Sequence, residues 1–273
     1  MLGHPSPHTR RRSEHPPFAR ILCVIDGTDA SDAAIEQAIA IAGTDASIVF
    51  AASWYGKGSI DAGPDFDEER RDVVEHAVVR AHEAGAEACA RYFRTARLAE
   101  ALLGSIAQFD LVVVGAHRHS RAAGIVLSEI ATQLVHRCAL PVLVARDRPL
   151  SAGVVAATRA LPADRAAVTA GTHIAARLGA ELTIVHVPEH GDEQRRVELK
   201  SELANARALL GRSLDYAEFE GPPARSIVDV TEGDGAGLVV VGSEGKQGLP
   251  ALRSVSERVA HLAPCSVLVI RNP

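Results

Sequence analysis

Strand-length apolar runs alternate with amphipathic stretches along this chain, and one of the runs occurs twice. The sequence LVVVG at Leu111–Gly115 returns letter for letter at Leu238–Gly242. Each copy leads into a loop, a helical pattern and a closing apolar run, Val142–Val144 in the first and Val267–Val269 in the second. An all-apolar run of this kind predicts a central strand buried on both faces. The chain is therefore predicted to be a tandem repeat of one domain.

The first copy opens with a strand, a turn and a helix. Ile21–Ile25 predicts a buried strand, Asp26–Asp29 a turn, and the apolar residues from Ile35 to Ala42 a helix, because they recur at i, i+3, i+4 and i+7. The stretch from Ser53 to Phe66 predicts a long loop, which in a compact domain usually has a function. The other elements expected are strands over Ser47–Ala52, Tyr92–Phe93, Val112–Val114 and Val142–Val144 and helices over about Asp67–Cys89, Leu98–Ala107 and about Gly124–Arg137.

The second copy repeats this plan from Gly153. Its expected strands and helices include Val154–Ala157, Ala163–Leu178, Leu182–Val187, Asp192–Leu210 and Leu214–Phe219. Strands that alternate with crossovers of helical length imply parallel sheets, wound right-handed, with helices on both faces. Each half should be an α/β, five-stranded flavodoxin-like domain, with boundaries at residues 18–149 and 150–273 after a disordered tail over residues 1–17. We expect the closing strands to pair in an internal pseudo-dimer, because unpaired apolar edges are avoided.

Composition narrows the functional class. The 273 residues are 47% apolar, enough for two cores, and the formal charge of −5 gives no electrostatic reason to expect nucleic acid or an anionic membrane as a partner. No apolar run is long enough to span a bilayer and the N-terminus has no signal-peptide core, so we expect a cytoplasmic protein. No disulfide and no metal site are expected from the widely spaced cysteines, which are Cys23, Cys89, Cys138 and Cys265.

Several segments resemble the universal stress protein family. They are the opening Val24–Ser31 and, in the second copy, Val239–Gly245, Ser254–Val259 and Ala263–Val269. The resemblance extends from about Phe18 to Arg271. It implies a stress-response role in a family that has both ATP-binding and non-binding members. In the binding members, an Asp at the end of the first strand meets the adenine side, and a glycine loop, G-x2-G-x9-G-[ST], holds ribose and phosphates.

The first copy keeps only part of that pattern. By the resemblance, its ligand-binding residues are Asp26, Gly27, Thr28, Gly115, Arg118 and Ser128. Arg118 stands at the second glycine position, Ser128 at the third, and Glu129 at the Ser/Thr position. A guanidinium binds phosphate well, so we expect Arg118 to be the anion contact if a nucleotide binds here.

The second copy departs elsewhere. Its candidate residues are Gly242, Ser243, Gly245, Gly248 and Ser254, whose amides and helix N-terminus suit an anion. Its loop is two residues shorter, however, Arg253 replaces the third glycine, and Arg159 lies at or near the place of the first-strand Asp. We therefore expect the second copy to be the poorer adenine site.

Structural readings compete with these assignments. Ser254-x-x-Glu257 is also a capping box, and Asp26 can cap a helix or close an Asx turn without touching a ligand. His117-x-His119 is a weak metal pattern. Gly233-x-Gly235-x-Gly237 precedes a strand instead of following one, so it is read as a linker and not as a dinucleotide fingerprint.

Catalytic motifs are missing from the sequence. It has no Walker lysine motif, no G-x-S-x-G elbow and no H-E-x-x-H, so an enzyme is the less favoured reading. We expect a tandem binding or signalling module that takes ATP, with Mg²⁺, in one half. The alternatives are a scaffold for protein contacts that binds no nucleotide, and a slow ATPase. A homodimer of the whole chain is left open.

Overall fold

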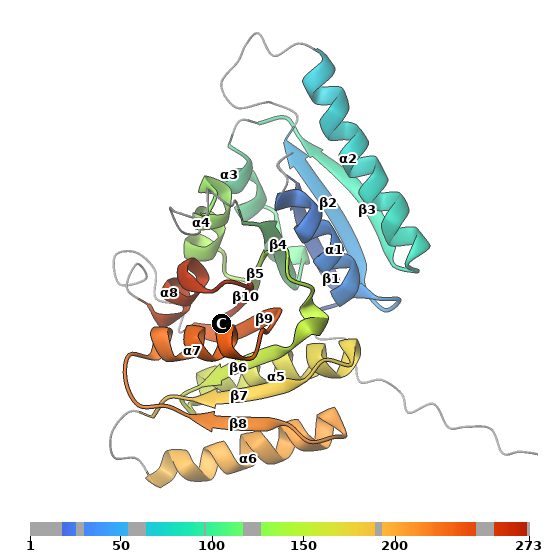
Figure 1. Ribbon diagram of the computed structural model, residues 1–273. Coiled ribbons are helices and arrows are strands. Elements are labelled where there is room, and N and C mark those ends of the chain that lie inside the picture. The colour runs from blue at the N-terminus through green and yellow to red at the C-terminus, as the bar shows by residue number, and fades with distance from the viewer. Residues whose placement is uncertain are drawn as a thin grey trace, which may run out of the picture.

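The protein forms one continuous ten-stranded sheet covered by helices on both faces (Figure 1). This computed structural model describes residues 18–25, 30–53, 64–95, 97–116, 127–188, 193–243 and 254–271. The expected tail over residues 1–17 and most of the long loop after Ser53 lie outside them. The strand order is β3-β2-β1-β4-β5-β10-β9-β6-β7-β8.

Each half contributes five of the strands. The first half contains β1 (Arg20–Ile25), α1 (Ala30–Ala42), β2 (Ser47–Ser53), α2 (Pro64–Glu83), β3 (Glu87–Phe93), α3 (Leu98–Leu103), β4 (Leu111–Gly115), α4 (Glu129–Arg137) and β5 (Val142–Ala145). The second contains β6 (Val154–Thr158), α5 (Pro162–Leu178), β7 (Leu182–His186), α6 (Glu193–Leu210), β8 (Asp215–Glu218), α7 (Pro223–Gly233), β9 (Leu238–Ser243), α8 (Val255–Leu262) and β10 (Ser266–Arg271).

Within each half all neighbouring strands are parallel, which confirms the predicted flavodoxin-like class. The chain moves outward from β1 to β3 and then returns to place β4 on the other side of β1; β6 and β9 repeat this step. Parallel doubly wound sheets bind ligands at such a switch point, beyond the carboxyl ends of the strands. The fold therefore offers one crevice between β1 and β4 and another between β6 and β9.

The halves join through their closing strands, as the apolar runs predict. β5 and β10 are antiparallel, with Val144 opposite Val267 and Val142 opposite Val269. Because this pair is antiparallel, the strands of the two halves run in opposite directions. The two crevices consequently open at opposite edges of the sheet.

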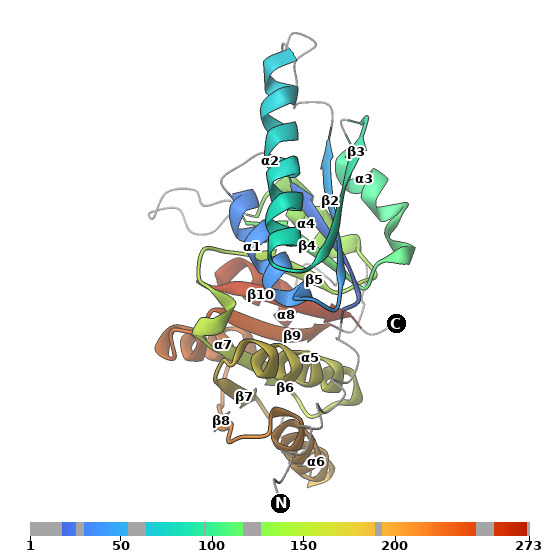
Figure 2. The same cartoon turned by 90° about the vertical axis from the view of Figure 1, so that its right-hand side faces the viewer.

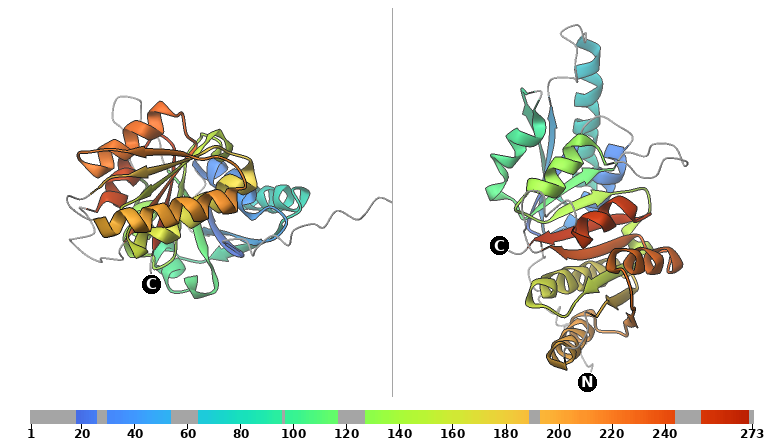
Figure 3. Two further views of the ribbon diagram at one scale, coloured as in Figure 1. Left: turned by 90° about the horizontal axis from the view of Figure 1, so that it is seen from below. Right: turned by 90° about the vertical axis from the view of Figure 1, so that its left-hand side faces the viewer.

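Helices from both halves share one face of the sheet. Figure 2 shows α1, α2, α5 and α6 on this face, and Figure 3 (right) shows the opposite face with α3, α4, α7 and α8. Under the first group a single apolar cluster crosses the junction, from Ile21 and Leu143 in the first half to Leu268 and Val154 in the second. The other face has a separate cluster for each half. The shared cluster makes the two halves one packed body.

Two arginines reinforce the junction from equivalent positions, Arg146 buried and Arg271 half-buried. Arg146 follows β5 and Arg271 ends β10, each two residues after the matching Val144 and Val269. The Arg146 guanidinium donates to the carbonyl oxygens of Ala260 (2.5 Å) and Cys265 (2.6 Å) in the other half. Arg271 donates in turn to the Val135 carbonyl. Val135 matches Ala260 in the repeat, so the two contacts are related by a pseudo-twofold axis.

Two expected helices end earlier than predicted. α2 stops at Glu83 and not near Cys89, because Gly85 adopts φ +84° and the amides of Gly85 and Ala86 bond back to the carbonyls of His82 and Ala81. This is a Schellman motif, which ends a helix at a left-handed glycine. The following residues form the edge strand β3, which is longer than the two-residue strand expected. α3 likewise ends at Leu103, and a 3-10 turn over Ile106–Gln108 replaces its predicted continuation.

The cysteines are free, and three of them are buried. Cys23 lies inside β1, where burial raises the pKa of its thiol, and burial raises the pKa of Cys265 to about 11. These two thiols are therefore protonated core residues at neutral pH. None of the described helices is both long and apolar enough to cross a bilayer.

Candidate functional site

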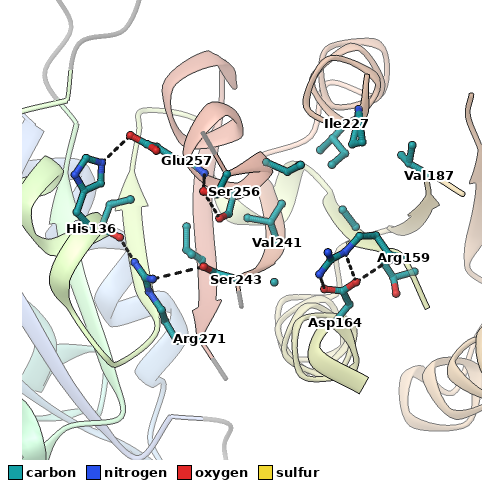
Figure 4. A pocket seen from close by; sticks show the side chains of 18 residues that line it. His136, Arg159, Asp164, Val187, Ile227, Val241, Ser243, Ser256, Glu257 and Arg271 are labelled. Carbon is teal, nitrogen blue, oxygen red and sulfur yellow. Dashed lines mark hydrogen bonds and ion pairs between the residues drawn. The ribbon is translucent and has the colours of Figure 1, made fainter. Parts of the chain in front are cut away.

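A cavity of about 290 Å³ lies at the carboxyl ends of β6 and β9, at the switch point of the second half (Figure 4). Ala157 of β6, Val241 of β9, Val187 after β7 and Ile227 of α7 give it an apolar wall. The other wall comes partly from the first half, because the C-terminal end of α4 reaches this edge of the sheet and contributes His136. The site is therefore complete only when the two halves are joined.

An ion pair occupies the position next to the end of β6. Ile21 of β1 pairs with Leu111 of β4, and Val154 of β6 pairs with the matching Leu238 of β9, so Val154 is equivalent to Ile21. Five residues further on, Arg159 therefore stands where the first half has Asp26. The sequence comparison of the copies is thus confirmed on this point. Asp164, in the first turn of α5, accepts hydrogen bonds from the Arg159 backbone amide (2.9 Å), Nε (3.0 Å) and Nη2 (3.0 Å).

This pair closes one end of the cavity. The Asp164 side chain is 4% exposed and the Arg159 side chain 27%. Three hydrogen bonds from Arg159 hold the Asp164 carboxylate in place, and its negative charge neutralises the guanidinium. The edge of the crevice where an adenine-binding Asp would stand is therefore filled by an internally paired Arg.

The serines at the other side cap the helix that begins there. Ser254 is the N-cap of α8, and its Oγ accepts a hydrogen bond from the Glu257 amide (3.2 Å). The Ser254 and Ser256 hydroxyls are also in contact at 3.2 Å. The predicted N-cap role of Ser254 is thus confirmed. The second half of the capping box is not formed, because the Glu257 carboxylate contacts His136 instead. Gly242 and Ser243 end β9 and line the cavity, while the predicted Gly245 and Gly248 lie outside the described residues.

An acid lies beside this helix start. His136 Nε2 donates to Glu257 Oε1 across the junction at 2.7 Å, and Glu257 is 7% exposed. The other carboxylate oxygen, Oε2, has no hydrogen-bond partner among the described residues. His261 lies 4.0 Å from Oε1, and its pKa is lowered mainly by burial, with a smaller contribution from His136. A buried carboxylate at this place works against binding a highly charged anion.

Arg271 supplies the cation on the same side. Its Nη1 is 3.5 Å from Ser243 Oγ, and burial lowers its pKa. Figure 4 shows Arg271 and Ser243 below the His136–Glu257 contact, with the Arg159–Asp164 pair across the cavity. The arrangement can hold a small, partly apolar ligand with one polar group facing Arg271.

The first-half crevice is defined by the ends of its elements. Gly115 ends β4, where an added Cβ would lie 2.2 Å from the Ala30 carbonyl oxygen. Its lack of a side chain therefore lets α1 approach the strand. Ser128 is the N-cap of α4, and its Oγ accepts from the Ala131 amide (3.1 Å). Asp26, Gly27, Thr28 and Arg118 lie outside the described residues.

Sequence reasoning missed Asp164, His136 and Arg271 as cavity residues. Asp164 had a local signal, since it follows Arg159 by five residues at the start of an expected helix. His136 and Arg271 come from opposite sides of the junction, so only the pairing of β5 with β10 reveals their place. Within the described residues, no group of three His, Cys, Asp or Glu side chains suits a metal ion, and the His117-x-His119 pattern lies outside them.

The sequence of this chain is similar to those of known proteins. The sequence profile of the universal stress protein family matches residues 17–146 and 154–271. The chain is 34% identical over 131 residues to the universal stress protein YxiE of Bacillus subtilis, covering 38% of this chain and 88% of that protein. It is 30% identical over 185 residues to the universal stress protein Rv2005c of Mycobacterium tuberculosis, covering 60% of this chain and 62% of the relative.

A solved structure agrees over both halves. The crystal structure of a universal stress protein from Archaeoglobus fulgidus superposes with a TM-score of 0.74 at 19% identity, covering 93% of this chain and 98% of that one. At this identity the likeness supports the fold alone. Together with the two profile matches, which span most of the chain, it leads to one conclusion: the chain belongs to the universal stress protein family.

Proposed function

We propose that this protein is a non-catalytic binding module of the universal stress response that takes ATP, with Mg²⁺, in its first half only. The observation that supports this most strongly is the Arg159–Asp164 ion pair, because Arg159 stands in the second half at the position of Asp26 in the first. The halves would thus have divided their tasks. The second half keeps a cavity for a smaller ligand.

Magnitudes support excluding ATP from the second half. A micromolar ligand needs about 8 kcal/mol of binding free energy, whereas a helix N-terminus supplies about 0.3–1 kcal/mol, or up to about 2 when partly buried. The cavity of about 290 Å³ is at the lower limit of ordinary ligand pockets, about 300–1,000 Å³. Glu257 adds a nearby negative charge. Inorganic phosphate or a comparably small anion beside Ser243 fits these limits better than a nucleotide.

The first-half assignment rests on convergence at the switch point. Asp26 follows β1 directly, Gly115 ends the adjacent strand β4, and Ser128 begins α4. The ends of β1 and β4 and the start of α4 lie at the same edge of the sheet, where doubly wound folds bind ligands. We assign the phosphate contact to Arg118, because a guanidinium replaces the glycine that would bring backbone amides to the phosphates.

We further propose that the halves act as an internal pseudo-dimer. Its support is the pairing of β5 with β10 and the reciprocal contacts of Arg146 and Arg271, which have the form of an isologous interface. A ligand in the second-half cavity would touch both halves through His136 and Ile227. Binding there would stabilise the junction.

Calorimetric titration of the full chain with ATP, with and without Mg²⁺, tests the assignment. Two matched charge changes separate the halves. Asp26→Asn removes the first-half carboxylate, and Ser243→Asp adds a carboxylate at the mouth of the second-half cavity. We expect one ATP site that is lost in Asp26→Asn and kept in Ser243→Asp.

Other outcomes would reject specific parts of the proposal. Loss of ATP binding in Ser243→Asp alone would place the nucleotide in the second half. No binding by the unmodified protein would favour the scaffold alternative, and ATP turnover that depends on Asp26 would favour a slow ATPase. Arg118→Gly should weaken binding, whereas tighter binding would identify Arg118 as an obstruction.

A further inference from the structure

A second hollow lies at the opposite edge of the second half from the cavity just described. It has a volume of about 540 Å³ and runs between the sheet and α7, at the amino ends of β6 and β7 and along β8. Its apolar lining includes Val155, Ala217, Phe219 and Val230. Among the described residues that line it, none is a candidate ligand residue. The groove is therefore separate from the second-half cavity.

The groove exists because small residues replace large ones. Leu111 and Leu238 are equivalent in the two halves. Counting back from them along the sequence, Ala236 stands at the position of Phe109 and Gly233 at that of Ile106. Phe109 is buried in the apolar cluster of the first half, and Ile106 packs against the same cluster. Part of the space that these side chains fill in the first half is left open in the second, where Ala236 lines the groove.

The glycine run before β9 helps to shape the groove. At Gly237 an added Cβ would lie 1.9 Å from the Pro149 carbonyl oxygen, and Gly235 adopts φ +63°. Only glycine suits both conditions, so the chain between α7 and β9 turns tightly and packs directly against Pro149. The segment first read as a linker is thus one wall of the groove, next to Ala236.

The lining has also changed charge relative to the first half. Val155, Thr183 and Asp215 lie side by side on β6, β7 and β8, where the first half has Leu22, Val49 and Cys89. Ala217 replaces Arg91 in the same comparison. The described residues that line the groove include the carboxylates of Glu181, Asp215, Asp229 and Asp234, and no Lys, Arg or His is among them.

These carboxylates are only partly compensated. Asp229 pairs with Arg225 on α7 at 2.9 Å, and Asp234 accepts a hydrogen bond from Thr183 at 3.0 Å. The Arg148 guanidinium lies near one end, where it donates to the Ala236 carbonyl at 3.3 Å. Arg212 donates to the Ala180 carbonyl beside Glu181. The described lining side chains themselves include four carboxylates and no cation, so their own net charge is negative. A complementary ligand is an extended chain that carries both positively charged and apolar side chains.

The strand that borders the groove favours the same kind of ligand. β8 pairs with β7 and is the last strand of the sheet, so its outer edge presents backbone groups. Extended segments bind such edges by adding a strand. We propose that this groove is a docking site for a basic, extended segment of a partner protein, with alternating Arg or Lys and apolar residues.

The chain's own basic run, Arg10–Arg12, precedes the described residues. The described chain starts at Phe18, next to β1, and β7 is six strand positions away, about 29 Å at about 4.8 Å per strand. Arg10, at the far end of the run, precedes Phe18 by eight residues, which span at most about 29 Å. Binding of the chain's own tail, from the same molecule or a second copy, is therefore an outcome of the test.

Fluorescence anisotropy with a labelled eight-residue peptide of alternating Arg and Val tests the proposal on the full chain. Ala217→Arg restores the first-half residue and opposes a cationic ligand, while Ala236→Phe fills the groove without changing its charge. Glu100→Gln, on α3 of the other half, is a control with the same one-unit charge change as Ala217→Arg. We expect at least tenfold weaker binding for both groove variants, no change for Glu100→Gln, and no binding of the peptide with Glu in place of Arg.

Each contrary result is decisive. Equal losses in Ala217→Arg and Glu100→Gln would show general attraction to an acidic protein and overturn the proposal. Wild-type affinity in a folded Ala236→Phe protein would also overturn it; if that variant fails to fold, Ala217→Arg decides. Tighter peptide binding after Arg10–Arg12 are changed to Ser would identify the chain's own tail as the competing occupant, contrary to a foreign partner.

Discussion

Replacing Arg146 by methionine tests how the two halves are held together. The residue is 4% exposed, and its guanidinium donates to the carbonyls of Ala260 and Cys265. Methionine keeps much of the aliphatic packing but donates no hydrogen bond. A buried acceptor that loses its donor costs about 1–3 kcal/mol, or about 2–6 kcal/mol for two. Release of the buried guanidinium offsets part of this, so we expect the free energy of unfolding to fall by about 3 kcal/mol.

Arg271→Met is the matched control from the other side of the pseudo-twofold axis. Arg271 is less buried, and across the junction it donates to one carbonyl, that of Val135. We expect a loss of about 1 kcal/mol. Urea unfolding followed by far-UV circular dichroism measures both values, and an unchanged m-value would show that the same surface is exposed. A smaller loss for Arg146→Met than for Arg271→Met would refute the reasoning.

Three further changes probe other parts of the fold. Gly115→Ala should lower the free energy of unfolding by about 1–3 kcal/mol by overpacking α1, while Gly104→Ala, whose added Cβ meets its nearest atom at 3.6 Å, should be tolerated in the same urea assay. Ser254→Ala should cost about 1 kcal/mol by removing the α8 cap, and a loss below about 0.3 kcal/mol would argue against the cap. Burial lowers the pKa of His186 below 6.5, so its neutral form contributes fully above about pH 6.5 and stability declines as pH falls; His186→Phe should flatten this decline in melts between pH 5 and 7.

The architecture could be predicted from the sequence because the strongest sequence signals are local and occur in both halves. The apolar runs at Val142–Val144 and Val267–Val269 suffice to predict that the closing strands pair, since each must be covered on both faces and at its edge. The β3 boundary was missed for a physical reason. As an edge strand it is largely exposed, and its mixture of Glu, Arg and Ala resembles the end of the preceding helix. Gly85 was the available signal.

The candidate site was only partly predictable. Arg159 could be assigned from the alignment of the two copies, but its neutralisation by Asp164 depends on how the loop before α5 folds. The His136–Glu257 contact joins residues far apart in the chain and in different halves. No periodicity specifies such a pair, because it arises from the way two complete sheets meet. The groove beside β8 was likewise hidden, since small residues such as Ala236 and Gly233 give no pattern of their own.

The antiparallel junction of β5 and β10 also bears on how the two halves evolve. In a dimer of identical chains, every substitution appears in both subunits, so a change that suits one site is imposed on the other. Covalent linkage removes this constraint and keeps the partners together at any protein concentration. Arg159 beside Asp164, and Ala236 where the first half has Phe109, are changes that a symmetric ancestor would have carried twice. Duplication within one chain allows each half to acquire its own specificity while the shared interface is retained.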